Sequence, residues 1–156
     1  MTGLSFEVVD EDERWGGEDK LRLLVDRVCV ALAALSVLRS SEAQFTILFT
    51  SDSQIQELNR QWRGQDKPTN VLSFPAAQDG NPEFSNYIGD IAIAYETIVR
   101  EAQEYDKVFE DHVLHMIVHG ILHLLGHDHE NDAEAEIMED LERKILAKTG
   151  IGDPYK

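Results

Sequence analysis

Residues 109–129 have the sequence FEDHVLHMIVHGILHLLGHDH, and we expect the rest of the chain to fold around them. Apolar side chains surround this predicted helix on most sides, which is typical of a helix buried inside a domain. Histidine is the exception, because all six histidines of the chain lie between His112 and His129. An unpaired imidazole inside an apolar core is costly, so the histidine face must border a polar pocket or a metal ion.

Three of these histidines have the spacing of a metal site. His119 and His123 are four residues apart, so they share one face of a helix. Gly126 supplies the backbone freedom to end the helix, and the chain can then turn back to bring His129 to the same ion. Three imidazole ligands with a fourth position open are typical of a catalytic zinc site. We therefore predict one Zn²⁺ per chain, bound by His119, His123 and His129.

Two questions about this site stay open. A rival ligand set, His115, His119 and His123, also has helical spacing, but it spans about 12 Å of helix axis, which disfavours a tetrahedral site. His115 is otherwise expected beside the ligands, among the groups that orient them. Asp128 can either orient a ligand imidazole or only cap the turn.

Outside this helix, short strands alternate with helices. Alternating apolar residues predict strands over 4–9, 44–49, 71–74 and 87–95. Helical spacing and capping signals predict further helices over about 18–39, 51–64, 97–106 and 132–148, with loops over 10–19 and 76–86. Because helices dominate late in the chain, we predict an α+β fold of mixed α/β layers, in which helices cover a small mixed sheet of about four strands.

Composition limits the class of protein. The chain has 156 residues, of which 42% are hydrophobic, and this fits one domain over residues 1–156. Its single cysteine cannot form an intrachain disulfide, so we expect a reducing, cytoplasmic setting. The first twenty residues lack the pattern of a signal peptide, and the longest apolar stretch, about residues 28–38, is too short to cross a bilayer. A net charge of −16 argues against non-specific coating of nucleic acid, because phosphates would repel most of the surface.

The histidine spacing H-x3-H-x5-H, with Gly126 between the last two histidines, resembles the signature of metzincin metalloproteases. In that signature a glutamate follows the first histidine and acts as the general base. This chain has Gly120 at that position, and glycine has no proton acceptor in its side chain. A zinc peptidase is therefore a competing hypothesis that needs a base elsewhere.

The full string from 119 to 129, His-Gly-Ile-Leu-His-Leu-Leu-Gly-His-Asp-His, resembles the YbeY family of bacterial rRNA maturation factors. The resemblance extends to Leu58-Asn59, Arg63-Gly64, residues 67–75 (KPTNVLSFP) and Gly89-Asp90-Ile91. It departs at His127, where the family usually has tyrosine. The resemblance implies a zinc-dependent, single-strand-specific endoribonuclease with a zincin-like metal helix. It also implies a role in processing of small-subunit (16S) rRNA, ribosome maturation and quality control, and it makes Arg63 the functional arginine of the family.

A guanidinium offers a planar fork of donors suited to phosphate, so we expect Arg63 to be catalytic and the nearby Arg60 and Lys67 to bind substrate. Whether zinc hydroxide or a ribose 2′-OH attacks the phosphate stays open. The expected partners are rRNA and the small ribosomal subunit, with basic ribosomal proteins or a ribosome-associated GTPase bound to the acidic surface. Neither DNA nor a membrane is expected. A non-catalytic ribosome-assembly factor with a structural zinc is the second competing hypothesis.

Overall fold

The computed structural model describes residues 4–35, 43–76 and 86–155. Along these ranges the elements are β1 (Leu4–Asp10), η1 (Glu13–Trp15), α1 (Glu18–Ala34), β2 (Ala43–Thr50), α2 (Asp52–Arg63), β3 (Val71–Pro75), β4 (Tyr87–Ala94), α3 (Tyr95–Glu104), α4 (Phe109–Leu124) and α5 (Asp132–Lys148). Within the same ranges, none of the helices combines the length and the apolar content that crossing a bilayer needs.

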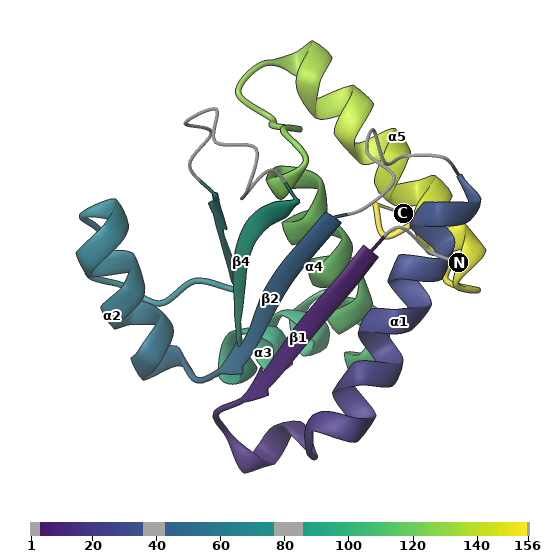
Figure 1. The fold of residues 1–156 in the computed structure, drawn as a ribbon. Helices are drawn as coiled ribbons and strands as arrows, with labels where there is room; N and C mark the ends of the chain where they lie inside the picture. Colours follow the sequence, from purple (N-terminus) through teal and green to yellow (C-terminus); the bar gives the residue numbers. More distant parts are fainter. Residues whose placement is uncertain (1–3, 36–42, 77–85, 156) are drawn as a thin grey trace.

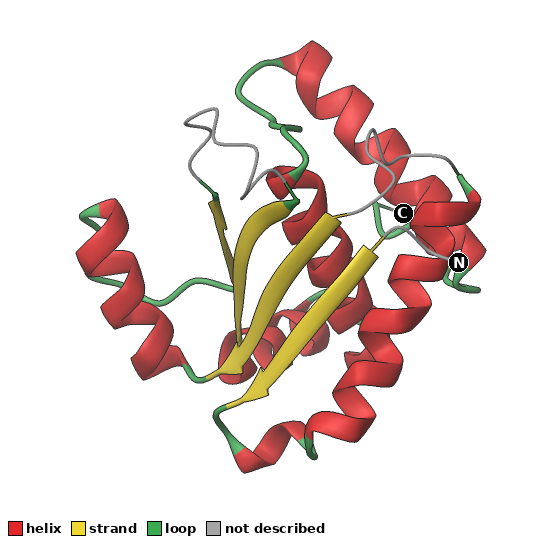
Figure 2. Ribbon diagram, in the orientation of Figure 1, coloured by secondary structure: helices red, strands yellow, loops and turns green. Residues whose placement is uncertain are grey.

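The four strands form one mixed sheet in the order β1-β2-β4-β3. β1, β2 and β4 run parallel to one another, and β3 lies antiparallel to β4 at the edge. Parallel neighbours need a crossover connection, and α1 provides the one between β1 and β2. Pro75 ends β3, a position that suits proline because β3 is an edge strand. The predicted small mixed sheet covered by helices is confirmed (Figure 2).

The helix α4 lies at the centre of the molecule. Figure 1 shows α1, α4 and α5 on one side of the sheet and α2 on the other. α4 contacts α1, α3, α5 and the strands β3 and β4. Its apolar residues are almost completely buried, as the sequence predicts: Val113, Leu114, Met116, Ile117, Val118, Ile121 and Leu122.

Gly120 allows α4 to pack closely on the sheet. A Cβ atom at this position would lie 2.9 Å from Cγ2 and 3.1 Å from Cδ1 of Ile91 on β4. The hydroxyl of Ser73 on β3 also donates a hydrogen bond to the carbonyl of Gly120, at 3.0 Å. The missing side chain and this bond hold the histidine-bearing helix against β3 and β4.

Two helix boundaries differ from the prediction. α1 ends at Ala34, whereas the predicted helix continues to about residue 39. Residues 36–39 lie outside the described residues, and so do residues 77–85 of the loop predicted over 76–86. α3 begins at Tyr95, earlier than the predicted Thr97. The carboxylate of Asp52, at the start of α2, accepts the backbone N–H of Thr97 at 3.1 Å and its hydroxyl at 2.7 Å. Because the cap comes from another helix, the local sequence carries no N-cap signal.

Candidate metal centre

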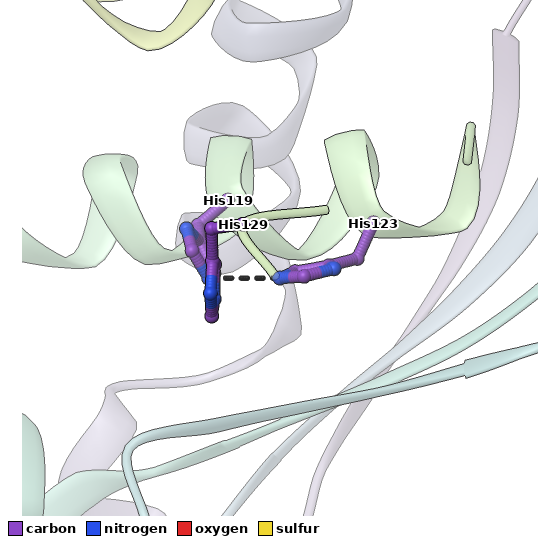
Figure 3. Close-up of side chains that lie close together, drawn as sticks. All are labelled: His119, His123 and His129. Carbon is purple, nitrogen blue, oxygen red and sulfur yellow. Dashed lines mark hydrogen bonds between the residues drawn. The ribbon is translucent and has the colours of Figure 1, made fainter. Parts of the chain in front are cut away.

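Three imidazoles converge at the C-terminal end of α4. Figure 3 shows the rings of His119, His123 and His129 gathered around one point. The Nε2 atoms of His119 and His123 are 3.1 Å apart. The ring of His129 lies 5.7 Å from that of His119 and 5.2 Å from that of His123, between centroids. One ring nitrogen of each residue lies within 4.8 Å of the other two.

The turn that returns His129 to the helix is built on Gly126. This glycine has a φ of 98°, in the left-handed region that side chains disfavour. Its N–H donates to the carbonyl of His123, and the N–H of His127 donates to the carbonyl of Leu122, both at 3.0 Å. This pair of bonds is the Schellman motif that ends many helices. The prediction that Gly126 ends the helix and reverses the chain is confirmed.

The side chain of Asp128 contributes to this turn. Its Oδ1 accepts the backbone N–H of His129 at 2.8 Å. Of the two roles left open for Asp128, the structure therefore shows the contact within the turn. Its negative charge also acts to raise the pKa of His123, although larger effects outweigh it.

The donor set and its spacing fit a zinc ion. Two nitrogens that bind one tetrahedral zinc at about 2.0–2.1 Å lie about 3.3 Å apart, close to the 3.1 Å between His119 and His123. Burial lowers the pKa of His123, and the neighbouring His119 and His129 lower it further. A lowered pKa favours the neutral imidazole, which is the form that binds metals. The rival set is not assembled, because the Nε2 of His115 is hydrogen-bonded to Glu142.

A buried carboxylate from α5 contacts one of the three imidazoles. Glu142 is 1% exposed, and its oxygens contact the Nε2 of His115, the Nδ1 of His119 at 3.5 Å and the hydroxyl of Tyr155 at 3.0 Å. Burial acts to raise the pKa of Glu142, but the contacts with His115 and His119 outweigh it and lower the pKa to about 2. Sequence analysis missed Glu142. Its signal is a glutamate on the apolar face of the helix, between Met138 and Ile145.

Arg63 lies in the same cavity as the histidines. This cavity has a volume of about 620 Å³ and is lined by residues of β3, of α4 and of the turn after α4, as well as by Arg63. The guanidinium of Arg63 donates a hydrogen bond to the carbonyl of Ser73, and it lies 5.6 Å from the centre of the Phe74 ring. These contacts hold the positive group at the rim of β3, facing a cavity that also contains the three imidazoles.

Arg60 and Lys67 lie outside this cavity. Arg60 forms an ion pair with Glu57 one turn earlier on α2, and both side chains are about half exposed. Lys67 is exposed, and its carbonyl accepts the amide of Asn59 at 2.9 Å. A role of Arg60 and Lys67 in substrate binding stays a prediction.

A second carboxylate connects the cavity to the N-terminal half of α4. Glu101 of α3 binds the Nε2 of His112 at 2.9 Å and the amide of Asn70 at 3.1 Å, and Asn70 lines the cavity. Burial acts to raise the pKa of Glu101, but His112 and Asn70 stabilise its charged form, and the net effect is a lowered pKa. The sequence does not predict these contacts of Glu101, because residues far apart in the chain make them.

Comparisons with known proteins identify the family of the chain. The family model described as "Endoribonuclease YbeY" matches residues 7–150. A protein of Rhizobium etli named endoribonuclease YbeY is 49% identical over 100% of this chain and 95% of its own length. One of the same name from Chelativorans is 52% identical over 90% of this chain and 86% of its own. The solution structure of TM1509 from Thermotoga maritima matches with a TM-score of 0.60 and 26% identity, over 97% of this chain and 99% of that one. The chain therefore belongs to the YbeY family.

Proposed function

We propose that this protein is a zinc-dependent endoribonuclease that cleaves single-stranded RNA in the processing of small-subunit (16S) rRNA, and so acts in ribosome maturation and quality control. One observation carries the proposal: three convergent imidazoles and a guanidinium line one cavity of about 620 Å³. The relatives named endoribonuclease, at 49% and 52% identity, support the choice of RNA as substrate.

The residues that would hold the metal are His119, His123 and His129. When bound, a zinc ion supplies Lewis acidity and lowers the pKa of a coordinated water to about 7. The neutral imidazoles do not offset the charge of the cation that they hold. The half-buried positions of His119 and His123 at the cavity wall exclude part of the bulk water from around them, which strengthens electrostatic interactions there.

The role of Arg63 follows from its position and its chemistry. A guanidinium is a planar, positively charged group that can bind two phosphate oxygens at once. The carbonyl of Ser73 and the ring of Phe74 restrict its orientation, so little conformational freedom remains to be lost when it binds substrate. We assign Arg63 to binding and orienting the scissile phosphate and to stabilising the charge that develops on it.

The peptidase hypothesis is disfavoured by the packing of α4. A metzincin-type base at position 120 would need a side chain where the Cβ alone would lie 2.9 Å from Ile91. Glycine at this position is thus a requirement of the helix–sheet contact, and the buried Glu142 does not replace that base. Glu142 is buried behind His119, with its oxygens already in contact with three side chains.

The acidic charge of the chain bears on how it reaches RNA. A net charge of −16 predicts weak intrinsic affinity for a polyanion. We propose that rRNA is presented on the small ribosomal subunit in the cytoplasm, and that basic ribosomal proteins or a ribosome-associated GTPase bind the acidic surface. If affinity purification at low salt recovers no ribosomal component, this part of the proposal is wrong.

The test of the activity uses purified protein loaded with zinc. We expect cleavage of a single-stranded RNA, no cleavage of a DNA strand of the same sequence, and loss of RNA cleavage on chelation or in His119→Ala. Arg22→Ala is a suitable control, because it removes a charge from an exposed position on α1 that does not line the cavity. RNA cleavage that survives both chelation and His119→Ala refutes the mechanism. An RNA-inactive protein that still supports ribosome maturation when Arg63 is replaced indicates the assembly-factor alternative.

A further inference from the structure

The carboxylate of Glu142 is buried between α4, α5 and the C-terminal segment. Only 1% of the residue is exposed, and its neighbours along the same face of α5 are the apolar Met138 and Ile145. Burying a carboxylate is costly unless hydrogen bonds and opposite charges compensate for the lost water. A glutamate at such a position needs a reason beyond the packing of α5.

Three polar groups surround this carboxylate, two from α4 and one from the C-terminal segment. The Nε2 of His115, on α4, binds Oε2, and the hydroxyl of Tyr155, near the C-terminus, donates to Oε1 at 3.0 Å. The Nδ1 of His119 lies 3.5 Å from Oε1. The ring of Tyr155 packs edge-on against that of His115, with centroids 5.5 Å apart. His115 and Tyr155 thus hold the carboxylate in one orientation, with an oxygen directed at His119.

The contact with His119 has a consequence at the other side of its ring. A carboxylate beside Nδ1 favours the tautomer with the proton on Nδ1, which leaves the lone pair on Nε2. This Nε2 is the atom that lies 3.1 Å from the Nε2 of His123. The two ring nitrogens of His119 therefore have separate roles, one facing Glu142 and one facing the other imidazoles.

We propose that Glu142 is a positioning residue of the metal centre, which sets the tautomer and the ring orientation of His119 and is itself held by His115 and Tyr155. The proposal rests on the proposed zinc site, but it does not depend on RNA being the substrate. It gives His115 an indirect role, through Glu142, and it assigns the C-terminal Tyr155 to the support of the metal site.

The test compares Glu142→Gln with Glu136→Gln. Glutamine has nearly the same shape as glutamate, but it is neutral and its NH₂ group cannot accept a hydrogen bond. Glu136 is exposed on the same helix, so its replacement controls for the loss of one negative charge. Zinc affinity is measured by competition with a chromophoric chelator. We expect it to fall about 10–100-fold in Glu142→Gln and to stay unchanged in Glu136→Gln.

A second measurement does not require metal. The ¹⁵N chemical shifts of the His119 ring in the metal-free protein report its tautomer, and we expect Nδ1–H in the wild type and a mixture of tautomers in Glu142→Gln. Tyr155→Phe removes one hydrogen bond to the carboxylate but keeps its charge, so it should weaken zinc binding by a smaller factor. Should Glu142→Gln fail to fold, Tyr155→Phe carries both measurements.

The outcomes separate this proposal from the proposed function. Unchanged zinc affinity and an unchanged His119 tautomer in a folded Glu142→Gln overturn it, even where the variant is less stable, since that result shows a purely structural role. A wild-type protein that binds no zinc contradicts the proposed function, and the tautomer measurement then still decides the role of Glu142 toward His119.

Discussion

Replacing Gly120 by alanine tests the packing that places the histidine helix on the sheet. Alanine in a helix interior is favoured over glycine by about 1 kcal/mol, so propensity alone predicts a more stable protein. The added Cβ, however, would lie 2.9 Å from Cγ2 and 3.1 Å from Cδ1 of Ile91, a β-branched residue with little rotamer freedom. Overpacking of this kind costs about 1–3 kcal/mol. We therefore expect Gly120→Ala to be destabilising by up to about 2 kcal/mol.

A double-mutant cycle with Ile91→Ala isolates this clash. Ile91→Ala removes the three atoms that would lie nearest to the new Cβ, at its own cost of about 2–5 kcal/mol. In that background the propensity term remains, so Gly120→Ala should become stabilising by about 1 kcal/mol. Urea denaturation of the four proteins measures the coupling. Equal effects of Gly120→Ala in both backgrounds refute the close approach of α4 and β4, and with it our explanation for the missing glutamate.

Four further predictions follow from the site and its surroundings. Arg63→Ala should lower kcat for RNA cleavage by about 10²–10³-fold, the effect of removing one donor to a transition-state oxygen. It should leave the zinc content unchanged. A loss of zinc as large as the loss of activity in this variant would contradict the role of Arg63 in phosphate binding. Zinc at 100 times its Kd should stabilise the fold by about 2.7 kcal/mol, so the unfolding temperature should fall when the zinc is removed with a chelator. An unfolding temperature that does not change with zinc is evidence against a zinc site in the folded state. The contacts of His112 and Asn70 lower the folded-state pKa of Glu101 below its ordinary value of 4.5, so they add stability that is present above that value and lost as the pH falls through the lowered pKa. The free energy of unfolding, measured by denaturation across this pH range, should therefore fall less steeply in Glu101→Gln than in the wild type. Identical pH profiles of the two proteins would refute the linkage. Burial raises the pKa of Cys29 to about 12, so its thiol should react with an alkylating reagent only on unfolding, and rapid modification of the native protein would show that α1 is not packed as described.

Local patterns predicted most of the elements and the turn at the metal centre. Ser51 accepts the N–H of Gln54 at 3.3 Å, as the capping pattern predicts, and Gly126 ends α4 in the left-handed conformation. Both features depend on residues within one or two turns of each other. The same holds for the pair His119 and His123, whose spacing places both imidazoles on one face of α4, where their Nε2 atoms are 3.1 Å apart.

Contacts between distant segments could not be read from the chain. The strand order β1-β2-β4-β3 depends on which crossovers bury the most apolar surface, and no short motif encodes it. Asp52 caps α3 across 45 residues, and Glu142 reaches His115 across 27. A buried glutamate on an apolar helix face is a visible irregularity, but only the fold shows that its partners are the histidines.

The most direct test of the account is the zinc environment of the purified protein, measured by metal analysis and X-ray absorption at the zinc edge. We predict one zinc per chain with three imidazole nitrogens at about 2.0–2.1 Å and one oxygen ligand, and loss of this signal in His123→Ala. A protein that takes up no stoichiometric zinc after loading, or a zinc shell without three imidazoles, would contradict the assignment of His119, His123 and His129.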